Sequence, residues 1–191
     1  MELVKHGCYT FGMKWADIQE LPCSTARALS VIGDRWTALI VRDAFMGVRR
    51  FDDWQASLGI TRHRLSDRLD KLVEDGVLER RPYQTNPVRN EYRLTAKGRD
   101  LYPIILMLKQ WGDKWMAGEA GPPALHRHTK CGHITQPTLV CSECHEPLSP
   151  FDMEALPGPG LANHPLVKPQ PESGPANTKA ATKVAKKRTK A

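Results

Sequence analysis

The stretch "TRHRLSDRLDKLVEDGVLERR", residues 61–81, decides the fold. Its leucines recur at the spacing of one helical face, and Gly76 marks the end of that helix. Thr61 is a favourable N-cap residue for the start of the helix. The first turn carries Arg62, His63 and Arg64. A buried apolar stripe behind a cationic first turn is typical of a recognition helix that enters the major groove of DNA.

The residues on both sides of this helix complete a DNA-binding motif. Residues 53–58 predict a short helix that Gly59 closes, and two helices joined by a tight glycine-containing turn form a helix-turn-helix. Residues 77–83 and 89–94 predict two short strands, because Asn86-Pro87 between them is a turn signal. The strands would form a β-hairpin wing.

Thr95 begins what the pattern predicts to be the longest helix, with apolar residues on two flanks as far as Trp115. One flank is enough for packing within the domain, so the second indicates a partner subunit, and we expect a homodimer. The predicted fold is mainly α with a small β-hairpin wing, a winged helix-turn-helix.

The predicted DNA contacts come from the recognition helix and the wing. At 100° per residue, the face opposite the leucines centres on His63, Arg64, Asp67 and Lys71. Arginine reads guanine edges and the helix N-terminus attracts phosphate, while wing arginines reach phosphates or the minor groove. Asp67 should pair with Lys71 or Arg68, or accept from a cytosine amine. The full predicted set is Thr61, Arg62, His63, Arg64, Asp67, Arg68, Lys71, Arg80, Arg81, Arg89 and Arg93.

Three segments, "CSTARALSVIGDRWTALIVRDAFMGVRRFDDW", "LGITRHRLSDRLDKLVEDGVLERRPY" and "EYRLTAKGRDLYPIILMLKQWGDKW", carry a family resemblance over residues 23–115. The chain resembles the HxlR-type branch of the MarR-like winged-helix transcription regulators. The resemblance implies a homodimeric, non-enzymatic regulator that binds double-stranded DNA, usually as a repressor of a nearby operon.

Cys23 lies where the resemblance places the redox-sensing cysteine of some HxlR-type regulators. A thiol near a helix N-terminus is favoured as the thiolate, and Arg27 lies one turn further on. Cys23 is therefore a candidate redox sensor. The alternative is a small buried residue in a packed arm.

A second module follows a linker and has the sequence "HRHTKCGHITQPTLVCSECHEPL". His128 and Cys131 are separated by two residues, as are Cys141 and Cys144, which is ligand spacing for a tetrahedral structural zinc site. The resulting prediction is a zinc-ribbon-like module. Spacing alone leaves His126, His133 and His145 as alternatives to His128, and a flexible tail with incidental cysteines as an alternative to the metal site.

The end of the chain is basic and of low complexity. It predicts a disordered tail whose six positive charges, within residues 173–191, would bind phosphates or only solubilise the protein. Without them the body is nearly neutral, although the whole chain carries +7. The predicted divisions are 1–22 (arm), 23–117 (winged domain), 118–125 (linker), 126–153 (zinc-ribbon-like module) and 154–191 (tail).

These patterns together predict a cytoplasmic, sequence-specific repressor that acts as a homodimer on a pseudo-palindromic operator. No stretch is apolar enough to span a membrane. Two rivals are a thiol-dependent redox enzyme that uses Cys141 and Cys144, and an architectural protein that coats DNA through its tail. No βαβ pattern surrounds the cysteine pair, which disfavours the enzyme. The sequence identifies neither the effector nor the regulated genes.

Overall fold

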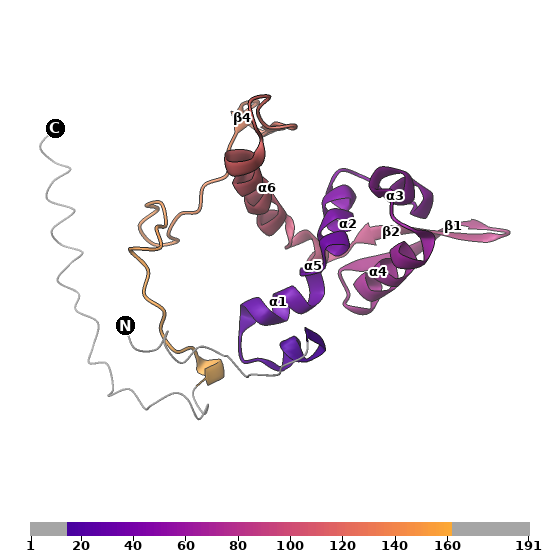
Figure 1. Ribbon diagram of the computed structural model, residues 1–191, viewed down its shortest axis with the longest axis horizontal. Helices are drawn as coiled ribbons and strands as arrows, with labels where there is room; N and C mark the ends of the chain where they lie inside the picture. The colour runs from indigo at the N-terminus through magenta and orange to yellow at the C-terminus, as the bar shows by residue number, and fades with distance from the viewer. Residues whose placement is uncertain (1–14, 162–191) are drawn as a thin grey trace, which may run out of the picture. The chain divides into compact units, whose positions relative to one another are not determined.

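The computed structural model of the protein describes residues 15–161 (Figure 1). Of these, residues 15–153 belong to one compact unit and residues 154–161 to a second unit. The first unit begins with the 3-10 helix η1 (Trp15–Glu20), which lies in the predicted arm. The predicted tail falls mainly on residues 162–191, which lie outside the described residues. Among the described residues, the helices are all too short or too polar to cross a bilayer.

Four helices and a hairpin enclose the core of the winged domain. The helices are α1 (Ser24–Ile32), α2 (Arg35–Phe45), α3 (Phe51–Leu58) and α4 (Arg62–Glu74). The buried apolar residues come mainly from α2, α3 and α4 and from the start of the hairpin, and they include Ile40, Val41, Trp54, Leu65, Leu69, Leu72 and Leu78. Burial of each large side chain stabilises the fold by about 1.5–3 kcal/mol relative to exposure. The predicted stripe of α4 is therefore its core face.

Two polar contacts fix where these helices begin and how they pack. Asp34 caps α2, because its Oδ1 accepts hydrogen bonds from the backbone N–H groups of Trp36 (2.9 Å) and Thr37 (3.2 Å). Trp54 is fully buried and donates its Nε1–H to the Ile40 carbonyl at 3.2 Å, which joins α3 to α2. Thr61 takes the predicted N-cap position of α4, but its side chain forms no capping hydrogen bond.

The wing is an antiparallel hairpin of β1 (Leu78–Thr85) and β2 (Val88–Leu94). It projects beyond the helices in Figure 1. Both strands extend further toward the turn than predicted, and the turn at Asn86-Pro87 is confirmed. A register shift between Pro82 and Gln84 gives the hairpin a bulge before its tip.

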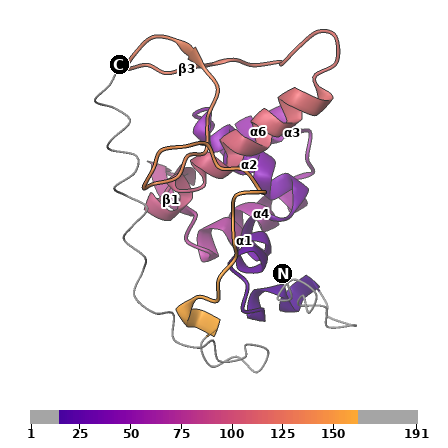
Figure 2. The same cartoon turned by 90° about the vertical axis from the view of Figure 1, so that its left-hand side faces the viewer.

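The predicted long helix from Thr95 is wrong in one respect, since it is two helices. The short α5 (Ala96–Arg99) ends before α6 (Tyr102–Met116) begins. Pro103 is the physical reason: it has no N–H to donate, and its ring would clash with the carbonyl of Arg99 four residues earlier. It sits in the first turn of α6, where that N–H is not needed. Helix α6 lies beside α2 (Figure 2) and has no buried residue.

After α6 the chain forms two small hairpins and no core. Strand β3 (His126–Arg127) pairs with β4 (Ile134–Thr135), and Val140 forms an isolated bridge with Pro147. None of the residues from 118 to 153 is buried. The second unit contributes the 3-10 helix η2 (Pro159–Leu161).

Candidate nucleic-acid interface

Helices α3 and α4 and the turn between them form the predicted helix-turn-helix. The turn passes through Gly59, whose φ of 61° is a left-handed conformation that favours glycine. Helix α3 begins at Phe51, two residues earlier than predicted. Leu65, Leu69 and Leu72 face the core, and the first turn of α4 is exposed. This geometry presents the N-terminal half of α4 to an external partner.

The three basic side chains of that first turn have different surroundings. The Arg62 Nη1 lies 3.1 Å from Asp52 Oδ1 and 3.0 Å from Gln55 Oε1, and its guanidinium lies over the Phe51 ring. Arg62 therefore ties α4 back to α3. Within residues 15–161, Arg64 forms no side-chain hydrogen bond or ion pair. Arg64 is thus a cation of the recognition helix whose donors are all available.

The expected pairing of Asp67 with Lys71 or Arg68 is wrong. Asp67 Oδ1 lies 3.5 Å from Nδ1 of His63, one turn earlier. Lys71 instead pairs with Asp75 at 3.1 Å. Arg68 pairs with Asp34, its Nε lying 3.2 Å from Oδ1, so the residue that caps α2 also holds α4. The ion pair between Arg68 and Asp34 depends on the packing of α4 against α2. The spacing of residues along α4 alone cannot predict it.

The wing arginines do not form one basic patch, because strand alternation divides them between two faces. Arg80 shares the face of Tyr92 and forms an ion pair with Asp70 of α4. Hydrogen bonding to Tyr92 and the nearby charge of Asp70 raise the pKa of Arg80. Arg89 is exposed near the hairpin tip and, among the residues that the structure describes, has no side-chain ion pair.

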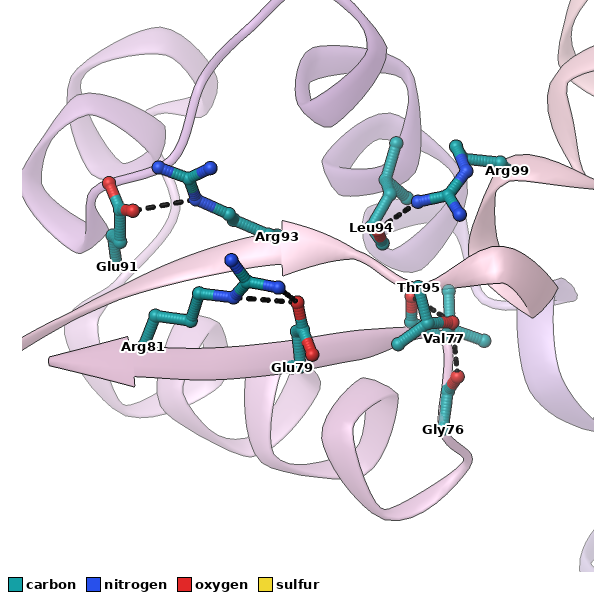
Figure 3. Close-up of polar contacts among 9 residues, drawn as sticks. All are labelled: Gly76, Val77, Glu79, Arg81, Glu91, Arg93, Leu94, Thr95 and Arg99. Carbon is teal, nitrogen blue, oxygen red and sulfur yellow. Dashed lines mark hydrogen bonds and ion pairs between the residues drawn. The ribbon is translucent and has the colours of Figure 1, made fainter.

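Arg81 and Arg93 lie on the opposite face of the hairpin, where glutamates hold them (Figure 3). Arg81 Nη2 is 2.6 Å from Glu79, and Arg93 Nε is 2.7 Å from Glu91. Both arginines line a cavity of about 530 Å³ between α2, the hairpin and the start of α6. Arg80 is therefore the wing arginine on the side of the recognition helix α4, and Arg89 is the wing arginine near the hairpin tip.

The sequence analysis missed one cation beside the wing. Arg50 precedes α3 and its guanidinium lies over the Tyr83 ring of β1, 4.6 Å from the ring centre. It also forms an isolated β-bridge with Glu91, which fastens the hairpin to the helix-turn-helix. The signal in the sequence was the pair of adjacent arginines in "GVRR", immediately before the helix-turn-helix.

Cys23 lies at the N-cap position of α1 and is half-buried. The backbone N–H of Ala26 is the main cause that lowers the pKa of its thiol. Contacts with Thr25 and the charge of Arg27 act in the same direction, while partial burial opposes them. The pKa of the Cys23 thiol is therefore lower than that of a free cysteine, which is the direction expected from its place at a helix N-terminus.

The predicted zinc ligands come together as two separate pairs. Nδ1 of His128 lies 3.3 Å from Sγ of Cys131, and the Glu143 N–H donates to Sγ of Cys141 at 3.4 Å. Backbone N–H groups of Cys144 and Glu143 lower the pKa of the Cys141 thiol. Over residues 15–161, the structure gathers no group of three or more metal-binding side chains.

The fold and the exposed first turn of α4 define the class of protein: a transcriptional regulator with a helix-turn-helix DNA-binding domain. The model of the HxlR-like helix-turn-helix family matches residues 31–120. The uncharacterized HTH-type transcriptional regulator Rv3095 of Mycobacterium tuberculosis is 48% identical over 138 residues, which are 72% of this chain and 87% of that protein. The chain belongs to the HxlR-like helix-turn-helix family.

Other relatives agree with this family and differ in how much of the chain they cover. YdeP of Bacillus subtilis, an uncharacterized HTH-type transcriptional regulator, is 35% identical over 49% of this chain and 73% of its own length. The crystal structure of PA1607, presented as a candidate transcription factor, is similar with a TM-score of 0.66 at 35% identity, covering 72% of this chain and 96% of that one. The longer similarities extend beyond the residues that the family model matches.

Proposed function

We propose that this regulator is a sequence-specific repressor that binds a pseudo-palindromic operator as a homodimer. The observation that carries the proposal is the contrast within the first turn of α4. Arg62 is bonded to α3, while Arg64 is exposed and keeps its donors available. Arginine pairs bidentately with guanine O6 and N7 in the major groove. Arg64 is therefore the base-reading residue, and Arg89 at the wing tip contacts phosphate.

The exposed apolar face of helix α6 supports the proposal that two copies of the chain associate. Ile104, Leu108, Trp111 and Trp115 lie on one face of this helix and are 46% to 66% exposed. A monomer rarely exposes such a continuous apolar stripe, and a two-fold axis would cover it with the same stripe of a second chain. Such a dimer would place its two α4 helices on half-sites about 34–36 Å apart. The operator would then be an inverted repeat, and a repressor bound there would occlude a promoter in the cytoplasm.

A footprint on DNA recovered with the protein tests this proposal. We expect one protected inverted repeat, two chains per site, and derepression of the adjacent reporter when the gene is deleted. Uniform coating of DNA would instead favour the architectural protein. Lower reporter output after deletion would reverse the sign of regulation.

We also propose that Cys23 senses oxidants, because the N-terminus of α1 lowers the pKa of its thiol. Peroxide or a quinone should then weaken operator binding by the wild-type protein and leave the Cys23→Ser variant unaffected. Cys141→Ser is the matched control, and it should respond like wild type. A Cys23→Ser protein that still responds would place the sensor elsewhere.

A further inference from the structure

Two turns in the C-terminal module, residues 128–133 and 141–146, repeat the same backbone hydrogen bonds. In the first, the N–H of Gly132 donates to the His128 carbonyl at 2.7 Å, and Gly132 has a φ of 77°. In the second, the N–H of His145 donates to the Cys141 carbonyl at 3.0 Å, and His145 has a φ of 60°. Positive φ is uncommon for a residue with a side chain, although histidine adopts it more often than most, and here it repeats the conformation of Gly132.

Each turn closes a short hairpin with the same pairing. The N–H of His128 donates to the His133 carbonyl at 2.9 Å, and the N–H of Cys141 donates to the Glu146 carbonyl at 2.9 Å. His128, the first residue of the first turn, therefore corresponds to Cys141, the first residue of the second. Cys131 and Cys144 correspond in the same way as the fourth residues of the two turns. Both turns present two metal-binding side chains from one hairpin end.

The module has no buried apolar core of its own. Its larger apolar side chains are exposed, including Ile134 (53%), Leu139 (54%) and Phe151 (94%). A segment of this size with no buried residue lacks the free energy to fold through apolar burial alone. Small domains of this kind are usually held by disulfides or a metal, and structural zinc supplies folding free energy directly.

We propose that the two turns close on a single structural zinc ion whose ligands are His128, Cys131, Cys141 and Cys144. Zn²⁺ binds such a set of one imidazole and three thiolates tetrahedrally, and the three thiols release their protons as it binds. Four protein ligands leave no open position for catalysis. Each turn already holds its own two side chains, so closure requires only that the two hairpin ends approach one another.

The geometry also selects His128 among the histidines that spacing left open. His128 occupies the position of Cys141 in the repeated turn, and its Nδ1 lies 3.3 Å from Sγ of Cys131. His145 occupies the position of Gly132, and His133 that of Glu146. His126 precedes the turn, in the position of Leu139 before the second turn, so none of the three is at a ligand position.

Elemental analysis of the full-length chain, purified under reducing conditions without chelator, tests the site. We expect about one zinc per chain, as a single tetrahedral site requires. Cys141→Ser and His128→Ala should each lose the ion, whereas His133→Ala and Cys23→Ser are matched controls that should keep it. Binding to a random-sequence duplex should persist in all four variants, which shows that the winged domain is still folded.

Cobalt(II) in place of zinc gives a second readout. The wild-type chain should show the absorption of tetrahedral thiolate-bound cobalt. This absorption should be weaker in Cys141→Ser and unchanged in His133→Ala and Cys23→Ser. Reduced wild-type protein without zinc would overturn the proposal, as would zinc that remains in Cys141→Ser. A Cys141–Cys144 disulfide in metal-free protein would overturn it in favour of the redox pair.

Discussion

The winged domain and the C-terminal module are held together in different ways, although both are built from short elements. In the winged domain, side chains such as Trp54, Leu65 and Leu69 are completely buried. In the module, no residue from 118 to 153 is buried, and the order lies in two repeated turns. Apolar burial therefore accounts for the first region. It does not account for the second region, where the proposed zinc ion would supply folding free energy.

The winged domain and the C-terminal module also present different kinds of surface to a partner. The core of the winged domain fixes α4 by one face, which leaves the other face free to present Arg64. The module presents cysteines at hairpin ends, where a metal can bind but where no rigid surface exists to read DNA. We therefore expect sequence recognition to be a property of the winged domain.

The largest expected effect tests the core itself. Leu69→Ala should lower the free energy of unfolding by about 2–5 kcal/mol, because it opens a cavity where the side chain is fully buried. Phe151→Ala is the matched change in the module and should cost less than about 0.5 kcal/mol, since that ring is exposed. Urea unfolding followed by circular dichroism measures both. Equal costs for the two variants would contradict the proposed difference between the regions.

A pair of glycines tests how tightly the winged domain is packed. A Cβ on Gly98 would lie 2.2 Å from the Val77 carbonyl oxygen, so Gly98→Ala should destabilise the protein by about 1–3 kcal/mol. A Cβ on Gly112 would meet no atom within 4 Å. Gly112→Ala in helix α6 should therefore leave the thermal midpoint unchanged or raise it. A neutral Gly98→Ala variant would show that α5 can move away from the hairpin.

The next prediction asks whether DNA reading is confined to the winged domain. Arg64→Ala should weaken operator binding by about 1–3 kcal/mol and relax the preference at one base position. Arg81→Ala is the control: Glu79 already holds its guanidinium on the other face of the wing, so operator affinity should change by less than about 0.5 kcal/mol.

Fluorescence anisotropy on operator and random duplexes measures these effects. Equal losses on both duplexes would make Arg64 a phosphate contact. Cys141→Ser should keep the operator preference. If that variant loses the preference, the module takes part in recognition and the division between the two regions fails.

The smallest expected effect concerns Asp34, which both caps α2 and pairs with Arg68. Asp34→Ala removes both contacts and should cost about 1 kcal/mol of unfolding free energy, as loss of an N-cap does. Asn is as good an N-cap as Asp, so Asp34→Asn should cost less than about 0.5 kcal/mol, the value of a half-exposed ion pair. Denaturant titration of the two variants separates the cap from the pair. A larger cost for Asp34→Asn would mean that the pair positions α4.

The sequence by itself was sufficient for the contacts that depend on near neighbours. The spacing of Leu65, Leu69 and Leu72 predicted the buried face of α4, because neighbours on a helix are set by its period. The turn at Asn86-Pro87 followed in the same way, since turns are local. The winged helix-turn-helix was predictable for this reason, whereas the family came from the resemblance of residues 23–115.

The tertiary structure decided which charged side chains are available and which are engaged. Arg62 contacts Asp52 and Arg68 contacts Asp34 across helices, and separations along α4 alone carry no information about either contact. Strand alternation likewise divided Arg80 from Arg81. In the module, spacing allowed several histidines, and only the repeated turn distinguishes His128. Ion pairs between distant segments depend on the packing of whole elements, so only the folded chain determines them.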